Sequence, residues 1–250
     1  MDLGLAGKRV MVTGGTRGIG LATARVFAAE GALVSITYHS AQDVAEKVVD
    51  ELGGPERAHA VRYSLGDPAS VAAAVAAVEE RWGGIDALVA NALWFTWSDP
   101  SGAVPFERVP AQEWQARLRA NVDGTVLTVQ RALAGMRERR WGRVVLMSSI
   151  TARRGLPGSE TYSAAKGALH GFAKGLMWTR DGVLVNVVSP GATLTESSLA
   201  VDEALLARET AQTPSGRLSE PEEVARLVVF LCSAANGNIN GEIIHTAGGR

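Results

Sequence analysis

Tyr162 and Lys166 form the pair of residues in this 250-residue chain that is best suited to acid–base chemistry. They lie four positions apart on an expected helix, a spacing that brings both side chains to one face with Cβ atoms about 5–6 Å apart. A phenol has an unperturbed pKa of about 10, and a neighbouring ammonium lowers that pKa because it stabilises the phenolate. The pair therefore predicts a tyrosine that acts as general acid or base nearer neutral pH. The same spacing is also common for unrelated residues on a helix surface.

Ser148 and Ser149 directly follow an expected strand over residues 143–147. The carboxyl ends of the strands form the ligand-binding edge of a doubly wound α/β sheet. A hydroxyl at that edge can hydrogen-bond a carbonyl oxygen on which negative charge develops. Ser149 is therefore a candidate for orienting a substrate, and the alternative is that the two serines only cap the strand.

A glycine-rich loop joins the first expected strand to the first expected helix. Its sequence is Thr13-Gly14-Gly15-Thr16-Arg17-Gly18-Ile19-Gly20, with the spacing G-x-x-x-G-x-G. Residues without a Cβ permit a tight turn and a close approach of the backbone to a pyrophosphate. The helix N-terminus that follows offers free N–H groups to that anion. In isolation the motif could be a turn without a ligand, but between a strand and a helix it predicts a dinucleotide site.

The end of the second expected strand indicates which dinucleotide would bind. Proteins that prefer NAD carry an acidic residue about 20 residues after the loop. Here that position reads Tyr38-His39-Ser40, and the first acid is Asp43. Arg17 places a cation inside the glycine loop, and a cation without the acid favours a 2′-phosphate. The pattern predicts NADP(H), unless Arg17 is only a solvated surface charge.

These residues need a scaffold, and short apolar runs alternate with helical patterns along the chain. Strands are expected over residues 8–13, 32–38, 57–63, 86–90, 143–147, 184–188 and 242–245, and helices over residues 20–30, 41–52, 68–82, 110–119, 123–139, 160–178 and 220–233. Continuous apolar strands are typical of a sheet covered by helices on both faces. The alternation predicts an α/β fold with a single doubly wound parallel sheet of Rossmann type. We expect one domain over residues 1–250, with a substrate loop at about 193–214.

Composition narrows the classes of protein further. Hydrophobic residues make up 46% and charged residues 20% of the chain, which suits a large buried core. The formal net charge of −1 offers no basic excess for nucleic acid. The N-terminus lacks a signal-peptide pattern, and no apolar run approaches the roughly 20 residues that span a bilayer. We therefore expect a cytoplasmic protein that binds neither nucleic acid nor membrane. Cys232 is expected to be a lone buried thiol, and the histidines show no metal-ligand spacing.

Taken together, the motifs resemble the short-chain dehydrogenase/reductase family over nearly the whole chain. Besides the glycine loop, the matching pieces are Asn91-Ala92, Ala120-Asn121-Val122, Ser148-Ser149, Tyr162-Ser163-Ala164-Ala165-Lys166, Ser189-Pro190-Gly191 and Gly248-Gly249. The resemblance implies a catalytic tetrad that consists of Asn121, Ser149, Tyr162 and Lys166. Tyr162 would deliver the proton, and Ser149 would orient the substrate. Lys166 would lower the pKa of Tyr162 and hold the nicotinamide ribose, and Asn121 would hold a water that links Lys166 to solvent.

The same resemblance supplies the expected contacts to NADP(H). They are Gly14, Thr16, Arg17, Gly18, Ile19, Gly20, Tyr38, Ser40, Ser64, Leu65, Asn91, Lys166, Pro190, Gly191, Thr193 and Thr195. Pro190 and Gly191, with the hydroxyls of Thr193 or Thr195, would flank the nicotinamide carboxamide. No metal ligand is expected.

Within the family, the chain is most similar to 3-oxoacyl carrier-protein reductases and related ketoreductases. The similarity rests on Tyr38, on Gly216-Arg217 followed by Glu220-Pro221-Glu222-Glu223-Val224-Ala225, and on Gly241-Glu242. It implies NADPH-dependent reduction of a ketone to a secondary alcohol, with a substrate that is either free or bound to a carrier protein. It also implies a homo-oligomer, tetramer or dimer. The alternatives are alcohol oxidation or epimerisation, and a non-catalytic nucleotide-sensing protein on the same fold.

Several positions depart from the pattern of the family. Leu93 replaces a glycine beside the cofactor, and Ser64 replaces an aspartate that would face the adenine. The run 93–97 is unusually aromatic, so it is interpreted either as the wall of a site for an aromatic substrate or as ordinary burial or an oligomer contact. We expect Trp82, Trp114, Trp141 and Trp178 to be packing residues. The arginines at 137, 139, 140 and 143 are expected to form a solvated helix end, with docking of an acidic carrier protein as the alternative.

Overall fold

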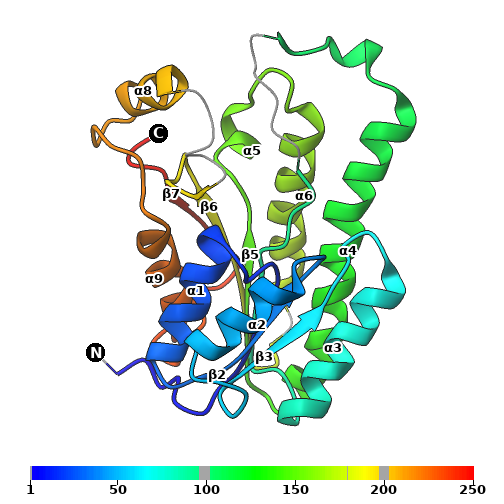
Figure 1. Ribbon diagram of the computed structural model, residues 1–250, viewed down its shortest axis with the longest axis vertical. Helices are drawn as coiled ribbons and strands as arrows, with labels where there is room; N and C mark the ends of the chain where they lie inside the picture. The colour runs from blue at the N-terminus through cyan, green and yellow to red at the C-terminus, as the bar shows by residue number, and fades with distance from the viewer. Residues whose placement is uncertain (1, 96–101, 179, 197–202) are drawn as a thin grey trace.

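The computed structural model shows one seven-stranded sheet in which every strand is parallel to its neighbours (Figure 1). It describes residues 2–95, 102–178, 180–196 and 203–250. The strands are β1 (Arg9–Val12), β2 (Leu33–Tyr38), β3 (Ala58–Arg62), β4 (Ala87–Ala90), β5 (Gly142–Met147), β6 (Val183–Pro190) and β7 (Ile243–Thr246). Their order in the sheet is β3-β2-β1-β4-β5-β6-β7. The doubly wound parallel sheet predicted from the sequence is confirmed.

Helices cover both faces of the sheet. They are α1 (Gly18–Ala29), α2 (Gln42–Glu51), α3 (Pro68–Trp82), α4 (Ala111–Glu138), α5 (Thr151–Arg154), α6 (Glu160–Leu176), α8 (Glu203–Ala211) and α9 (Pro221–Leu231). One apolar core joins the sheet to α1, α2 and α9, and a second joins it to α3, α4 and α6. Figure 1 shows these two helical layers on either side of the strands, with α5 and α8 above their upper ends.

Local sequence explains where several helices begin. Asp67 accepts a hydrogen bond from the backbone N–H of Ala69, and Pro68 occupies the first turn of α3, where a missing N–H costs nothing. At the start of α9, Glu220 and Glu223 form a reciprocal capping box around the first turn. These signals lie at or within one residue of the expected boundaries, so both helix starts could be read from the sequence.

Other boundaries were predicted wrongly. Residues 110–119 and 123–139 were expected to be two helices, but α4 runs without interruption through Ala120 and Asn121, which are both buried. The intervening residues include no proline or glycine, so nothing local breaks the helix. The short helix α5 and the helix α8 in the expected substrate loop had no sequence prediction at all. Neither has a strong periodic apolar pattern, because both lie over the edge of the sheet.

The strand order creates a crevice at the carboxyl edge of the sheet. The chain leaves β1 toward β2 on one side and returns to β4 on the other, so β1 and β4 are neighbours with connections that diverge. Ligands bind at such a switch point in open α/β sheets. Among the described residues, no helix combines the length and the apolar character that a membrane crossing requires. The described part of the chain also holds no cluster of three or more His, Cys, Asp or Glu residues that could bind a metal.

Candidate active site

Lys166 lies in the interior of the site. Its Nζ donates a 2.7 Å hydrogen bond to the carbonyl of Met147, the last residue of β5. Burial lowers the pKa of this lysine to about 8, because a low-dielectric environment disfavours the charged form. The ammonium lies 5.9 Å from the ring centroid of Tyr162, one turn earlier on α6. The predicted juxtaposition of the two side chains is present in the structure.

Tyr162 faces Ser149, which follows the end of β5. Burial raises the pKa of Tyr162, and a hydrogen bond with Ser149 acts in the opposite direction. The expected lowering of this pKa by Lys166 is therefore not seen in the structure. The physical reason is that desolvation penalises the phenolate, while the ammonium of Lys166 is bound to the Met147 carbonyl.

Ser148 connects Lys166 to His170, for which no role in the site was predicted. The Ser148 hydroxyl donates to the backbone carbonyl of Lys166 at 3.0 Å, and its oxygen lies 2.8 Å from Nε2 of His170. A hydroxyl has a single hydrogen, so Nε2 of His170 must carry a proton and donate to Ser148. The contact fixes the helix that carries Tyr162 and Lys166 against the end of β5.

Asn121 is buried on α4, and its side-chain amide binds the backbone of two other residues. Its Oδ1 accepts a hydrogen bond from the Trp94 N–H at 2.9 Å, and its Nδ2 donates to the Trp94 carbonyl at 2.8 Å and to the Arg117 carbonyl at 2.9 Å. Both amide hydrogens are thereby used. The side chain anchors the segment after β4 to α4, and the expected water that would link Lys166 to solvent stays a prediction.

The glycine loop has the shape that a pyrophosphate requires. Gly14 has a φ of +67°, and its N–H donates to Oγ1 of Thr37 at 3.0 Å. Asn91 donates to the carbonyls of Thr13 and Gly14 at 3.0 and 3.1 Å and so holds the loop against β4. A Cβ at Gly20 would lie 2.6 Å from Nδ2 of Asn91, which real Cβ atoms do not tolerate. The loop can keep this path only with glycine, and it leads into the N-terminus of α1, a position that favours an anion.

A cleft of about 1390 Å³ runs from the glycine loop to Tyr162. Every residue predicted to contact the cofactor lines it, as do Ser149 and Tyr162. Arg17 is exposed at the N-terminus of α1 and lines the cleft together with Tyr38, His39 and Ser40 from the end of β2. The acids among the described lining residues are Glu196 and Glu209, which follow β6 rather than β2. The cleft fits a dinucleotide, and its Arg17 end lacks the acid typical of an NAD site.

Comparisons with known proteins agree with this geometry. The profile of a family described as enoyl-(acyl carrier protein) reductase matches residues 14–250. A 3-oxoacyl-(acyl-carrier-protein) reductase of Aquifex aeolicus is 38% identical over 254 aligned residues, which cover 100% of this chain and 99% of the relative. The chain belongs to the short-chain dehydrogenase/reductase family. It is therefore an oxidoreductase, as the sequence predicted.

Two further relatives of this short-chain dehydrogenase/reductase show the same extent of similarity. An acetoacetyl-CoA reductase of Shinella zoogloeoides is 35% identical over 96% of this chain and 97% of the relative. A crystal structure of a short-chain dehydrogenase/reductase from Brucella melitensis, described as glucose/ribitol dehydrogenase, superimposes with a TM-score of 0.90. That structure is 30% identical, and the match covers 100% of this chain and 98% of the other.

The departures from the family pattern lie inside the cleft. Leu93 lines the cleft and is 40% exposed, so it takes the place of a glycine without blocking the fold. Ser64 also lines the cleft, and its N–H donates to the Ser70 hydroxyl at 2.9 Å. Both positions face the space that a dinucleotide would fill. Each can therefore change affinity without altering the arrangement of Ser149, Tyr162 and Lys166.

The sequence did not reveal how the substrate loop contacts the glycine loop. Glu196 accepts a hydrogen bond from the Gly18 N–H at 3.2 Å. Farther along, α8 lines the cleft, and Arg250 pairs with Glu209 and donates to Gln212 of this segment. These contacts join residues far apart in sequence, so no local motif predicts them.

Two expectations outside the cleft were wrong in part. Trp178 is 67% exposed and so is not a packing residue, whereas Trp82 packs on the core and donates to Ser35. The basic cluster is not one solvated helix end, because Arg143 is buried and donates to the carbonyls of Ser233 and Asn236. Burial lowers the pKa of Arg143. Cys232 is a free buried thiol, as predicted.

Proposed function

We propose that this protein reduces a ketone to a secondary alcohol with NADPH and that Tyr162 donates the proton. The observation that supports this proposal best is the placement of Tyr162, Ser149 and Lys166 together at the inner end of the dinucleotide cleft. The names of its relatives, 3-oxoacyl-(acyl-carrier-protein) reductase and acetoacetyl-CoA reductase, agree with a keto substrate.

Ser149, Tyr162 and Lys166 would each have a separate role in the reaction. Ser149 and Tyr162 present two hydroxyls to one carbonyl oxygen, which stabilises negative charge on that oxygen as it develops. Tyr162 holds its proton because burial raises its pKa, so the phenol is in the acid form before the reaction. Lys166, whose ammonium lies 5.9 Å from the Tyr162 ring centroid, favours the phenolate left after proton transfer.

The remaining cleft residues would hold NADPH, which supplies the hydride for the carbonyl carbon. The glycine loop and the N-terminus of α1 would bind the pyrophosphate. Arg17 would bind the 2′-phosphate. Pro190, Gly191, Thr193 and Thr195 would hold the nicotinamide end, and Lys166 would bind its ribose. Ser40, Tyr38, Ser64 and Leu65 would surround the adenosine.

The other expectations from the resemblance stay predictions. They are a homo-oligomer and a substrate that is free or carrier-bound. The single domain over residues 1–250 and the cytoplasmic location, which were expected from the sequence pattern, also stay predictions. The reverse reaction uses the same residues, so the direction of turnover is set by substrate and cofactor ratio.

The test of the proposed function is NADPH consumption by the purified protein, followed at the absorbance band of the reduced nicotinamide. Acetoacetyl-CoA and cyclic aromatic ketones are the substrates. Turnover of any ketone is the expected result. Tight NADPH binding without turnover of any of them would support the nucleotide-sensing alternative instead.

A further inference from the structure

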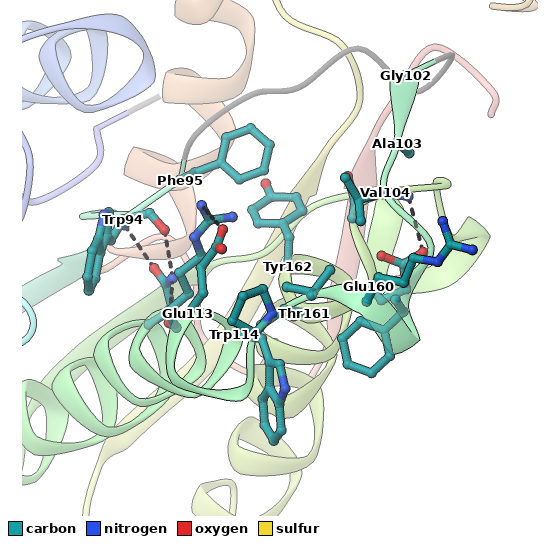
Figure 2. Close-up of a pocket in the computed structure, with 18 residues that line it drawn as sticks. Trp94, Phe95, Gly102, Ala103, Val104, Glu113, Trp114, Glu160, Thr161 and Tyr162 are labelled. Carbon is teal, nitrogen blue, oxygen red and sulfur yellow. Dashed lines mark hydrogen bonds and ion pairs between the residues drawn. The ribbon is translucent and has the colours of Figure 1, made fainter.

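A second cavity, of about 400 Å³, lies on the far side of Tyr162. It is formed by the segment 102–110, the first turns of α4, and the start of α6, and Figure 2 shows its lining. Among the described residues, the aromatic side chains that line it are Trp94, Phe95, Phe106, Trp114 and Tyr162. Its volume falls within the range of about 300–1,000 Å³ that small-molecule sites occupy.

The second cavity meets the dinucleotide cleft at the catalytic tyrosine. Trp94, Phe95, Ser159 and Tyr162 line both spaces. The Phe95 ring lies over the ring of Tyr162, with centroids 4.5 Å apart and planes tilted by 43° (Figure 2). A molecule whose carbonyl reaches Tyr162 from the cleft can therefore extend past Phe95 into the second cavity.

Backbone hydrogen bonds fix the wall between the two spaces. Asn121 holds both the N–H and the carbonyl of Trp94 with its side-chain amide. The residue before Phe95 is thus bound to α4 through both of its backbone polar groups. Because Asn121 positions this part of the wall, the wall can discriminate between substituents.

The charges around the second cavity balance. Its charged lining residues within the described chain are Arg108, Glu113, Arg117 and Glu160. Glu113 and Arg117 form an ion pair at 2.7 Å, and Glu160 accepts a hydrogen bond from the Gly158 N–H at 3.1 Å. Two cations and two anions give these side chains no net charge, so the cavity suits a neutral group.

The cavity also leaves apolar surface uncovered. Val104 is 56%, Trp94 49% and Phe106 44% exposed. Large exposed apolar patches on a protein surface often mark interaction sites or ligand-binding grooves. Aromatic side chains gain most from aromatic partners in stacked or edge-to-face contact.

On the basis of the proposed function, we propose that the second cavity binds an aromatic substituent of the ketone substrate. The carbonyl would lie between Ser149 and Tyr162, and the aromatic group would lie against Phe95, Phe106 and Val104. The preferred substrate is then an aryl ketone rather than a ketone with a short alkyl group.

A filled cavity provides the test. Val104→Trp places a large ring at an exposed position of the wall, where it does not disturb the core. Val44→Trp is the matched control, because Val44 is 38% exposed on α2 and lines neither space. The substrates are ethyl 3-(2-naphthyl)-3-oxopropanoate and ethyl acetoacetate, two β-keto esters that differ only in the substituent on the ketone.

The wild-type protein is expected to prefer the naphthyl ester in kcat/KM. Val104→Trp should lower kcat/KM for that ester by about tenfold or more and leave ethyl acetoacetate within about twofold, while Val44→Trp changes neither. Equal effects on both esters, or none on either, would overturn the proposal.

A binding measurement separates this proposal from the proposed function. If the wild-type protein reduces neither ester, calorimetry with the naphthyl ester and NADP⁺ still tests the cavity. Binding that Val104→Trp weakens by about tenfold would support the cavity even where the reductase proposal fails. Binding that Val104→Trp leaves unchanged, or no binding at all, would contradict the cavity proposal.

Discussion

Lys166 is a charged residue in a site that disfavours charge. The ordinary pKa of 10.5 falls to about 8 because the side chain is fully buried. A shift of that size corresponds to about 3 kcal/mol of unfavourable free energy for the protonated form in the folded protein. A lysine held in this way weakens the fold at neutral pH, and its placement is explained by the reaction rather than by stability.

Replacement of Lys166 by methionine should therefore stabilise the protein without cofactor. We expect Lys166→Met to raise the free energy of unfolding at pH 7 by about 1–3 kcal/mol, since the lost hydrogen bond to Met147 offsets part of the gain. Urea unfolding followed by tryptophan fluorescence measures it. Lys174→Met, on the exposed part of the same helix, is the control and should change stability by less than about 0.5 kcal/mol.

The pH dependence of this effect has a definite sign. Between pH 8 and 10.5 the unfolded chain binds more proton at Lys166 than the folded protein does. The stability of the wild-type protein therefore rises with pH in this window. The advantage of Lys166→Met should shrink as pH increases from 7 to 10. An advantage that stays constant would mean that the lysine is not the group responsible.

Arg17 is the residue on which the choice of dinucleotide depends. It lies at the N-terminus of α1 with an exposed side chain, and no described acid from the end of β2 lines the cleft. Arg17→Ala should weaken NADPH binding by about tenfold or more and leave NADH binding nearly unchanged, because only NADPH carries the 2′-phosphate.

Fluorescence titration with both cofactors measures the effect of Arg17→Ala. Arg25→Ala is the matched control, since Arg25 lies on the same helix but pairs with Glu51 at 2.5 Å instead of lining the cleft. Equal losses for NADPH and NADH would show that Arg17 does not bind the 2′-phosphate.

At the scale of elements, Asp86 joins β1, β4 and α4 at the edge of the sheet opposite the site. Arg9 donates to it through its backbone N–H at 3.0 Å and through its guanidinium at 2.8 and 2.5 Å, and Arg139 approaches at 3.5 Å. Burial acts to raise the pKa of Asp86, but the hydrogen bonds and charge of Arg9 outweigh it, so the pKa is lowered. The carboxylate thus holds three elements together at their amino or carboxyl ends.

Asp86→Asn should destabilise the protein by about 2–4 kcal/mol at pH 7, because it removes the negative charge that pairs with the partly buried guanidinium of Arg9. The contribution of Asp86 is present above its ordinary pKa of 3.8 and is lost as pH falls through its lower value in the folded protein. Urea unfolding at several pH values measures the loss of stability at pH 7 and its dependence on pH. Glu51→Gln breaks an exposed pair and should cost less than about 1 kcal/mol; an equal loss in both variants would contradict this account.

At the scale of the whole molecule, the sheet and the dinucleotide cleft could be predicted from local patterns. Continuous apolar runs such as residues 86–90 predict buried parallel strands. The spacing of the glycines predicts the dinucleotide loop. Tyr162 and Lys166 could be paired because one helix carries both. In each case the information lies within a few residues of sequence.

What could not be predicted depends on contacts between distant segments. Asn121 binds Trp94, and Ser148 contacts His170, through side chains whose partners no spacing reveals. The second cavity requires the segment 102–110 to lie over two helices at once. The aromatic run 93–97 shows the same limit: Trp94 and Phe95 form the wall of both spaces, while residues 96 and 97 lie outside the described part of the chain.

The central claim, that this chain reduces a ketone with Tyr162 as proton donor, is tested most directly by Tyr162→Phe. Steady-state NADPH oxidation with acetoacetyl-CoA is measured beside NADPH affinity, with Tyr63→Phe as control because its hydroxyl bonds Thr128 at 2.7 Å instead. We predict a loss of about 10²-fold or more in kcat for Tyr162→Phe, unchanged NADPH affinity, and retained turnover in Tyr63→Phe. Near-normal turnover in Tyr162→Phe would contradict the account.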